Sequence, residues 1–201
     1  MAKRVYSLVL SDEVVAEADR LARRLGVNRS GLINHILAEY LACGTTESAV
    51  REIFSAVEEL LGARDVFRVD GSDTRLCLRS SLDYKYNPTV RYTVELDPAG
   101  GEFRAGLRTQ NSLLVLYMSE FSRLWASLDG AESSCGEDGS FRRRFGGSYS
   151  DRDAAARRIS EYVGAFDGAM KAYFALLSDP AAAEAEVRKI HSNIKSIKTD
   201  D

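Results

Sequence analysis

The first forty residues carry the pattern that most restricts how this chain can fold. Side chains alternate between two faces over Val5–Leu10, and a period of two indicates a β-strand. Two amphipathic helical segments follow at once, joined at Gly26. A strand and two helices of this length are too small to bury a core of their own. We therefore expect this segment to complete its core in an intertwined dimer.

Local signals set the ends of the two helices. Ser11 can accept a hydrogen bond from a free amide of the first helical turn, which is the role of an N-cap. Gly26 can adopt the left-handed conformation that ends a helix, and Asn28 is a good cap for the next one. Each helix then carries one apolar stripe at spacings of three and four residues. The stripes are Val14, Ala18, Leu21, Ala22 and Leu25, and then Leu32, Ile33, Ile36, Leu37 and Tyr40.

This order of elements resembles the ribbon-helix-helix family of DNA-binding proteins, the MetJ, Arc and CopG type. The resemblance covers about a fifth of the chain. It implies a homodimer in which two strands, one from each copy, pair antiparallel and enter the major groove of double-stranded DNA. It is carried by VYSLVL at 5–10, SDEVV at 11–15, LARRLGVNRSGLI at 21–33 and ILAEYL at 36–41.

The resemblance also assigns roles to individual residues. The base-contacting strand positions that it implies are Lys3, Arg4, Val5, Ser7 and Val9. The start of the second helix, at Asn28, Arg29 and Ser30, corresponds to the family's phosphate anchor, where free amides and the helix dipole favour an anion. Residues 1–44 contain six basic and five acidic side chains, a net charge of +1.

The remaining sequence predicts an α+β domain. The apolar spacing predicts a helix over 48–61, and alternation predicts strands over 64–70, 74–80, 89–97 and 102–109. Short turns between these strands imply an antiparallel meander. Helices over 111–128 and 151–177 would back the sheet, and 141–145 is a candidate short strand. We divide the chain into a ribbon-helix-helix module at 1–44, a connecting helix at 45–62, the α+β domain at 63–178 and a helical tail at 179–201.

One face of the predicted sheet is rich in arginine. Two interpretations remain open for it. The arginines could bind an anionic ligand or DNA phosphates, because a guanidinium makes bidentate bonds to phosphate. They could instead form a solvated face whose charges pair with Glu95, Glu102 and loop acids. A second basic cluster, Arg142–Arg144, favours a solvated edge. The residues of the predicted face are Arg75, Arg79, Arg91, Arg104 and Arg108.

The C-terminal tail predicts one more helix. Asp179 followed by Pro180 is a good helix start. The apolar residues that follow at three-four-three spacing either pack on the protein's own body or bind a partner or another copy. They are Val187, Ile190, Ile194 and Ile197.

Composition limits the remaining classes of function. The 201 residues carry a net charge of −3, and no apolar run approaches the ~20 residues that span a membrane. The N-terminus lacks a signal-peptide core. Cys43, Cys77 and Cys135 are odd in number and lack metal-ligand spacing, so we expect packed, reduced thiols, no metal and a cytoplasmic protein.

Catalytic motifs are also missing from the sequence. The chain contains two histidines and shows no Ser/His/Asp order, no HExxH and no glycine-rich nucleotide fingerprint, so we expect neither an enzyme nor a cofactor. The leading hypothesis is a dimeric, sequence-specific DNA-binding protein, a transcriptional repressor, whose larger domain senses, oligomerises or binds a protein partner. The alternatives are a plasmid or mobile-element partition or relaxation factor, an antitoxin, and a dimeric interaction scaffold that binds no DNA.

Overall fold

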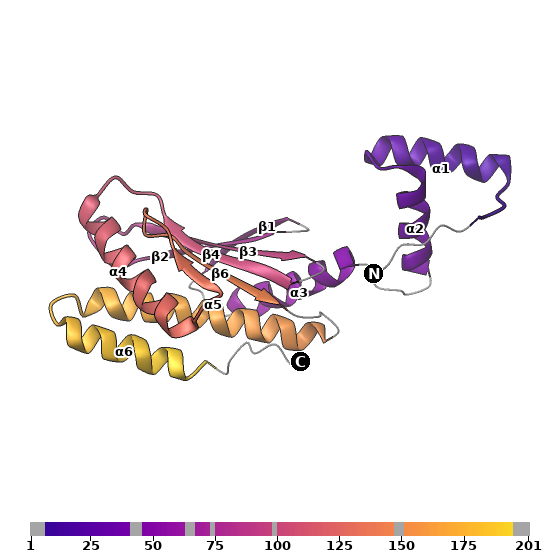
Figure 1. The fold of residues 1–201 in the computed structure, drawn as a ribbon. Helices are drawn as coiled ribbons and strands as arrows, with labels where there is room; N and C mark the ends of the chain where they lie inside the picture. Colours follow the sequence, from indigo (N-terminus) through magenta and orange to yellow (C-terminus); the bar gives the residue numbers. More distant parts are fainter. Residues whose placement is uncertain are drawn as a thin grey trace. The chain divides into compact units, whose positions relative to one another are not determined.

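The computed structural model describes residues 7–40, 46–62, 67–72, 75–97, 100–146 and 151–194. The chain divides into two compact units, residues 1–45 and residues 46–201. The first contains two helices, and the second contains a sheet with four helices (Figure 1). The predicted mixed α+β class is confirmed.

Helix α1 begins and ends where the sequence predicts, and α2 begins where the sequence predicts. Helix α1 spans Asp12–Leu25, and the Ser11 hydroxyl accepts a hydrogen bond from the Val14 amide at its start. Gly26 ends α1 with a φ of 69°, a conformation that costs glycine little because it has no Cβ. Helix α2 then spans Arg29–Tyr40.

The predicted N-terminal strand is not formed in the single chain. Val5 and Tyr6 lie outside the described residues, and Ser7–Leu10 belong to no strand. The described part of the first unit therefore has helices without the predicted ribbon. A two-stranded ribbon takes its backbone hydrogen bonds from the neighbouring strand, and the predicted neighbour belongs to a second copy.

The second unit is built on one six-stranded antiparallel sheet with the order β1-β2-β3-β4-β6-β5. The first four strands form the predicted meander, and β6 pairs with β4. Strand β5 was not predicted and lies in the Gly/Ser-rich stretch at 129–140. The strands are β1 (Arg68–Ser72), β2 (Arg75–Ser81), β3 (Thr89–Asp97), β4 (Gly100–Leu107), β5 (Ser133–Cys135) and β6 (Phe141–Gly146).

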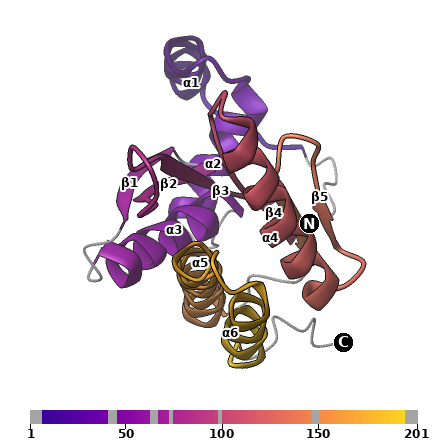
Figure 2. The ribbon, with the colours of Figure 1, turned by 90° about the vertical axis from the view of Figure 1, so that its left-hand side faces the viewer.

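Four helices cover one face of this sheet. They are α3 (Thr46–Gly62), α4 (Ser112–Asp129), α5 (Arg152–Ala175) and α6 (Pro180–Ser192). Figure 2, turned by 90° from Figure 1, shows α3, α5 and α6 on the same side of the strands. Strand burial alternates accordingly, so every second side chain of β2 and β3 is buried under the helices and the others are not. No described helix of this unit lies on the opposite face of the sheet, where the outward side chains of β2 and β3 are exposed or half-buried.

An aromatic cluster forms the centre of the core. The Phe166 ring of α5 lies 4.9 to 5.3 Å from the rings of Phe141, Phe103, Phe121 and Trp125. These rings come from α4, α5, β4 and β6, so one cluster joins the sheet to two helices. The contacts with Phe103, Phe121 and Trp125 are edge-to-face, and such a contact adds about 0.5–1.5 kcal/mol per pair beyond the burial of area.

The segments predicted as a connecting helix and a tail both belong to the second unit. Helix α3 contributes Ile53, Phe54 and Val57 to its core. Helix α6 begins at Asp179, whose side chain accepts from the Ala182 amide, and it buries Val187. Ile190 and Ile194 pack on the same core, while Ile197 lies outside the described residues. The described part of the apolar tail therefore packs on the protein's own body.

Candidate nucleic-acid interface

The predicted strand residues that the structure describes are open to solvent. Val9 is fully exposed and Ser7 is exposed, while Lys3, Arg4 and Val5 lie outside the described residues. In the single chain, Ser7 and Val9 belong to no strand, so no strand pairing fixes the direction of their side chains.

The predicted phosphate anchor at the start of α2 is already engaged inside the unit. The Asn28 side chain accepts a hydrogen bond of 2.7 Å from the Gly31 amide, which makes Asn28 the N-cap. The Arg29 guanidinium forms a two-point ion pair with Asp19 of α1, and its Nε lies 2.5 Å from Oδ1. Ser30 is exposed. Arg29 therefore ties α1 to α2, a contact between residues ten apart that sequence analysis missed.

The ion pair also changes the acid–base properties of its carboxylate. The hydrogen bond from Arg29 lowers the pKa of Asp19, although desolvation acts in the opposite direction. A lowered carboxylate pKa means that the pair is present above the ordinary pKa of aspartate and is lost as pH falls through the lowered value. At neutral pH, Asp19 competes with any phosphate for Arg29.

The predicted phosphate anchor at the start of α2 implies that Asp19→Asn should strengthen binding to duplex DNA. The substitution releases Arg29, and one added phosphate contact should make the plot of log affinity against log salt steeper by about 0.9. Fluorescence anisotropy with a labelled duplex over a salt series measures this slope. Glu13→Gln, also on α1 and exposed, makes the same change in net charge. Equal slopes for the two variants would show that Arg29 does not reach a phosphate.

The helical unit leaves most of its apolar side chains exposed. Among the described side chains of residues 7–37, Ala22 and Leu32 are buried. Both helices and the preceding segment present large apolar groups to solvent. These groups are Leu8, Val9, Leu10, Val14, Leu25, Val27, Ile36 and Leu37.

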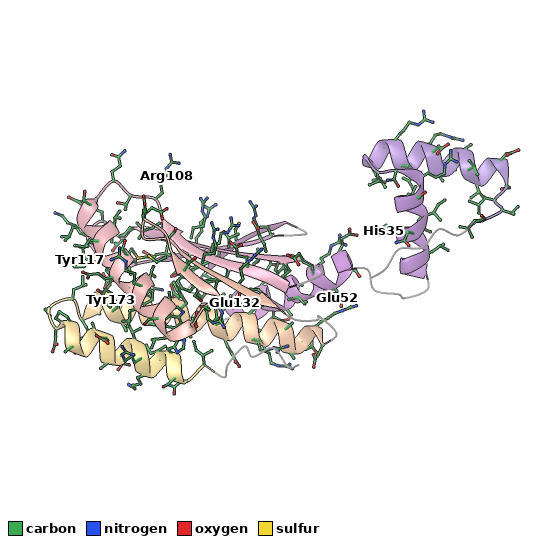
Figure 3. The ribbon with its side chains drawn as sticks, viewed as in Figure 1. His35, Glu52, Arg108, Tyr117, Glu132 and Tyr173 are labelled. Atoms are coloured by element: carbon green, nitrogen blue, oxygen red, sulfur yellow. The ribbon has the colours of Figure 1, made fainter. Side chains whose placement is uncertain are left out.

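The uncovered face of the sheet carries the predicted arginines. Arg75 and Arg79 of β2, Arg91 of β3 and Arg104 of β4 occupy its exposed positions. Arg108 follows β4 directly, and Figure 3 shows it pointing away from the end of the sheet.

Strand β6 extends this face in a way that the sequence analysis missed. It lies next to β4, and Arg142 and Arg144 are exposed on it beside Arg104 and Glu102. Arg142 therefore belongs to the same surface as the predicted residues and is not a separate edge cluster. We define the arginine face as the outward side chains of β2, β3, β4 and β6. The alternation of Phe141, Arg143 and Phe145 with Arg142 and Arg144 indicates which side chains of β6 share a face, and the pairing of β6 with β4 places Arg142 and Arg144 on this surface.

Acidic groups balance one end of the arginine face. Arg75 lies 2.6 Å from Glu95, while Glu102 pairs with Arg104 and lies 3.1 Å from Arg142. The hydrogen bond from Arg104 lowers the pKa of Glu102. A depression of about 460 Å³ lies at this end, beside the turn from β3 to β4, and three carboxylates and two arginines line it. The predicted pairing with Glu95 and Glu102 is therefore present here.

The other end of the face differs in charge. Arg79 of β2 lies directly opposite Arg91 of β3. Like charges placed opposite each other across two strands are destabilising.

Arg143, the middle member of the second basic cluster, points into the protein. Its Nη1 lies 2.7 Å from Asp129 Oδ1, and its guanidinium lies over the Tyr162 ring at 4.6 Å. His191 Nε2 lies 2.8 Å from the same carboxylate, and the Tyr162 hydroxyl donates to it. Burial and then the charge of Asp129 raise the pKa of Tyr162, which keeps the phenol protonated.

This buried cluster has the composition of an acid–base site but is arranged as a structural junction. The Asp129 side chain is 2% exposed, and its donors come from β6, α5 and α6. The Trp125 indole donates to the Tyr162 oxygen at 2.9 Å, so that oxygen is engaged on both sides. The carboxylate thus fixes four elements to one another, and sequence analysis gave no indication of it.

Across the described ranges, no three His, Cys, Asp or Glu side chains meet in a way that could hold a metal ion. None of the described helices combines the length and the apolar character required to cross a membrane. Comparisons with family models, curated proteins and solved structures found no match to this chain.

Proposed function

We propose that this protein is a homodimeric, sequence-specific DNA-binding protein that acts as a transcriptional repressor through an N-terminal ribbon-helix-helix module. The observation that carries the proposal is the exposed apolar surface of α1 and α2. The second unit then serves to sense, to oligomerise or to bind a partner.

A second copy of the chain supplies the apolar contacts that the helical unit lacks. Fewer than about 40 residues rarely bury enough surface to fold alone. Large apolar side chains on both helices, among them Ile36 and Leu37 of α2, are free to pack against the same side chains of another copy. A two-fold dimer makes this contact self-complementary, because each copy presents the same patch.

Dimerisation would also pair the segment that is unpaired in one chain. Two copies of Ser7–Leu10 placed antiparallel satisfy each other's backbone groups, and the pair forms a ribbon of the width that the major groove admits. Ser7 can then donate to or accept from a base edge, and Val9 can touch a thymine methyl group. The capped start of α2 would lie on the phosphate backbone.

Selection of duplexes from a random pool tests binding and specificity together. We expect the full chain to enrich a two-fold symmetric sequence, as a symmetric dimer requires. Ser7→Ala should change the preferred bases, because it removes the polar group from the described part of the strand. Ser55→Ala, at an exposed position on α3, is the matched control. A pool that shows no enrichment would refute sequence-specific binding, and a stable dimer without any DNA affinity would instead indicate an interaction scaffold.

A further inference from the structure

We infer that one end of the second unit, around Tyr86, is a docking surface for a proline-rich segment of a partner protein. The surface is formed by the turn between β2 and β3, the first two turns of α4 and the last turn of α5. We call it the tyrosine patch. Its members are Tyr84, Tyr86, Leu113, Leu116, Tyr117 and Tyr173. This inference goes beyond DNA binding and does not depend on it.

The backbone of the β2–β3 turn holds Tyr86 out in solvent. Tyr86 has a φ of 68° and Asn87 has a φ of 45°, so two successive residues with a Cβ adopt the left-handed conformation. This conformation is unfavourable for a side chain as bulky as tyrosine. The Tyr86 side chain is 88% exposed, so burial inside the unit does not offset the strain. Backbone strain of this kind is typical of sites that bind a ligand or a partner.

Aromatic rings continue from this turn across α4 to α5. The Tyr84 ring packs edge-on against Tyr117 of α4, with 6.4 Å between the ring centroids, and against Phe174 of α5 at 5.5 Å. Tyr173 lies next to Phe174, and its hydroxyl donates to Glu120 at 3.0 Å. Figure 3 shows Tyr117 and Tyr173 at the same end of the unit. Because Phe174 is buried, it fixes the rings around it in one arrangement.

The tyrosine patch contains most of the exposed large apolar side chains of the second unit. Among the described residues of this unit they are Tyr86, Leu113, Leu116 and, away from the patch, Leu60 of α3. Leu113 lies one helical turn before Tyr117, and Leu116 directly precedes Tyr117. Tyrosine is enriched at protein interfaces because its ring is apolar and its hydroxyl can form a hydrogen bond.

The tyrosine hydroxyls indicate the chemistry of the partner. Within the part of the chain that the structure describes, the hydroxyls of Tyr84, Tyr86 and Tyr117 form no hydrogen bond. A proline-rich segment adopts an extended polyproline II helix whose carbonyl groups have no internal donor. Its pyrrolidine rings pack on aromatic side chains, and its carbonyls can accept from tyrosine hydroxyls. Such a segment matches both the apolar and the polar groups of the patch.

The charges of the patch cancel, and this distinguishes a proline-rich segment from a charged partner. The turn at 82–88 contains Asp83 and Lys85, and the stretch 108–120 contains Arg108 and Glu120. The end of α5 and the turn after it, at 172–178, contain no charged residue. Two cations and two anions leave no net charge that would attract the phosphates of a nucleic acid. A neutral, apolar segment is the partner that complements this surface in charge.

An all-proline decapeptide with a fluorescent label tests the docking surface on the full chain. Fluorescence anisotropy should show binding at least roughly tenfold tighter than that of a Gly/Ser peptide of the same length. Tyr86→Ala should weaken binding of the decapeptide about tenfold, because an exposed tyrosine at the centre of an interface carries much of the affinity. Leu60→Ala, which truncates an exposed apolar side chain on α3, is the matched control and should bind like wild type.

Tyr86→Gly separates a role in binding from a role in folding. Glycine adopts the left-handed conformation without strain, so this variant should melt at the wild-type temperature or above it while it loses affinity for the decapeptide. Tyr117→Phe keeps the ring that packs on Tyr84 and removes the hydroxyl, and it should weaken binding several-fold. Wild-type affinity in both variants would show that neither group contacts the peptide.

Three outcomes would overturn the inference. The first is equal affinity for the decapeptide and the Gly/Ser peptide. The second is a self-association, measured by sedimentation, that Tyr86→Ala removes and Leu60→Ala does not, which would assign the patch to a second copy. The third is displacement of the decapeptide by DNA, which would assign the patch to nucleic acid. None of these measurements requires the N-terminal ribbon, so the DNA-binding proposal and this inference can fail separately.

Discussion

Ile36→Glu is expected to convert the dimer to a monomer and to abolish specific DNA binding. Ile36 is 46% exposed on α2 in the single chain, and the proposed second copy would cover it. A carboxylate in an apolar interface costs several kcal/mol unless it is paired, and a two-fold dimer places two of them there. A cost of about 3 kcal/mol already weakens dimerisation by roughly a hundredfold.

Sedimentation equilibrium measures this change directly. The wild-type chain should have twice the mass of the 22.2 kDa protomer, and the variant should have the protomer mass at the same concentration. Leu116→Glu is the matched control, because Leu116 is an exposed leucine on α4 with nearly the same exposed fraction, 48%. A wild-type monomer with a stable helical unit would contradict the dimer proposal, and so would a dimeric Ile36→Glu variant.

The parts of the fold that depend on neighbouring residues were predictable from sequence. Ser11 and Gly26 mark the ends of α1 because capping is decided within a few residues of the helix end. The strands of the meander follow from alternation, since burial under helices selects every second side chain. The Asp179-Pro180 start of α6 is equally local.

The missed features depend on contacts between distant segments. Strand β5 has three residues and is defined by its pairing with β6, which a Gly/Ser-rich stretch does not reveal. The Arg29–Asp19 pair requires the angle between two helices. Arg143 shares a face of β6 with the buried Phe141, so alternation alone would place it in the interior. A buried arginine needs a carboxylate partner, and nothing in the sequence around Asp129 indicates that it is that partner.

The residues of the candidate site also separate into those that local pattern predicts and those that depend on contacts between distant segments. Four arginines of the arginine face were assigned correctly because one strand's alternation places each of them. Arg142 and Arg144 were not assigned to it, because only the pairing of β6 with β4 places them there. The same limit applies to the predicted N-terminal strand, which is not formed in the described residues and whose hydrogen-bond partner is predicted to be another molecule. Sequence pattern therefore predicts which side chains share a face of an element, and it does not predict which elements lie together.

The second large effect is expected at Asp129, whose replacement by alanine should destabilise the second unit by about 3–5 kcal/mol. Asp129 is the last residue of α4, where the negative end of the helix dipole disfavours a carboxylate. Removing an exposed carboxylate from this position would therefore stabilise the helix slightly. The opposite is expected here, because Arg143 is only 14% exposed and would be left with a buried, unpaired charge.

Thermal melting monitored by circular dichroism measures this loss of stability. Glu161→Ala, which removes an exposed acid on α5, is the control and should stay within about 0.5 kcal/mol of wild type. At roughly 2–4 °C per kcal/mol, Asp129→Ala should melt on the order of 10 °C below wild type. Combining it with Arg143→Met should recover part of the loss, since removing both charges leaves no unpaired ion. Full additivity of the two substitutions would show that the pair is not coupled. A single Asp129→Ala variant as stable as wild type would show that the donors from β6, α5 and α6 find solvent instead, and that the carboxylate does not hold these elements together.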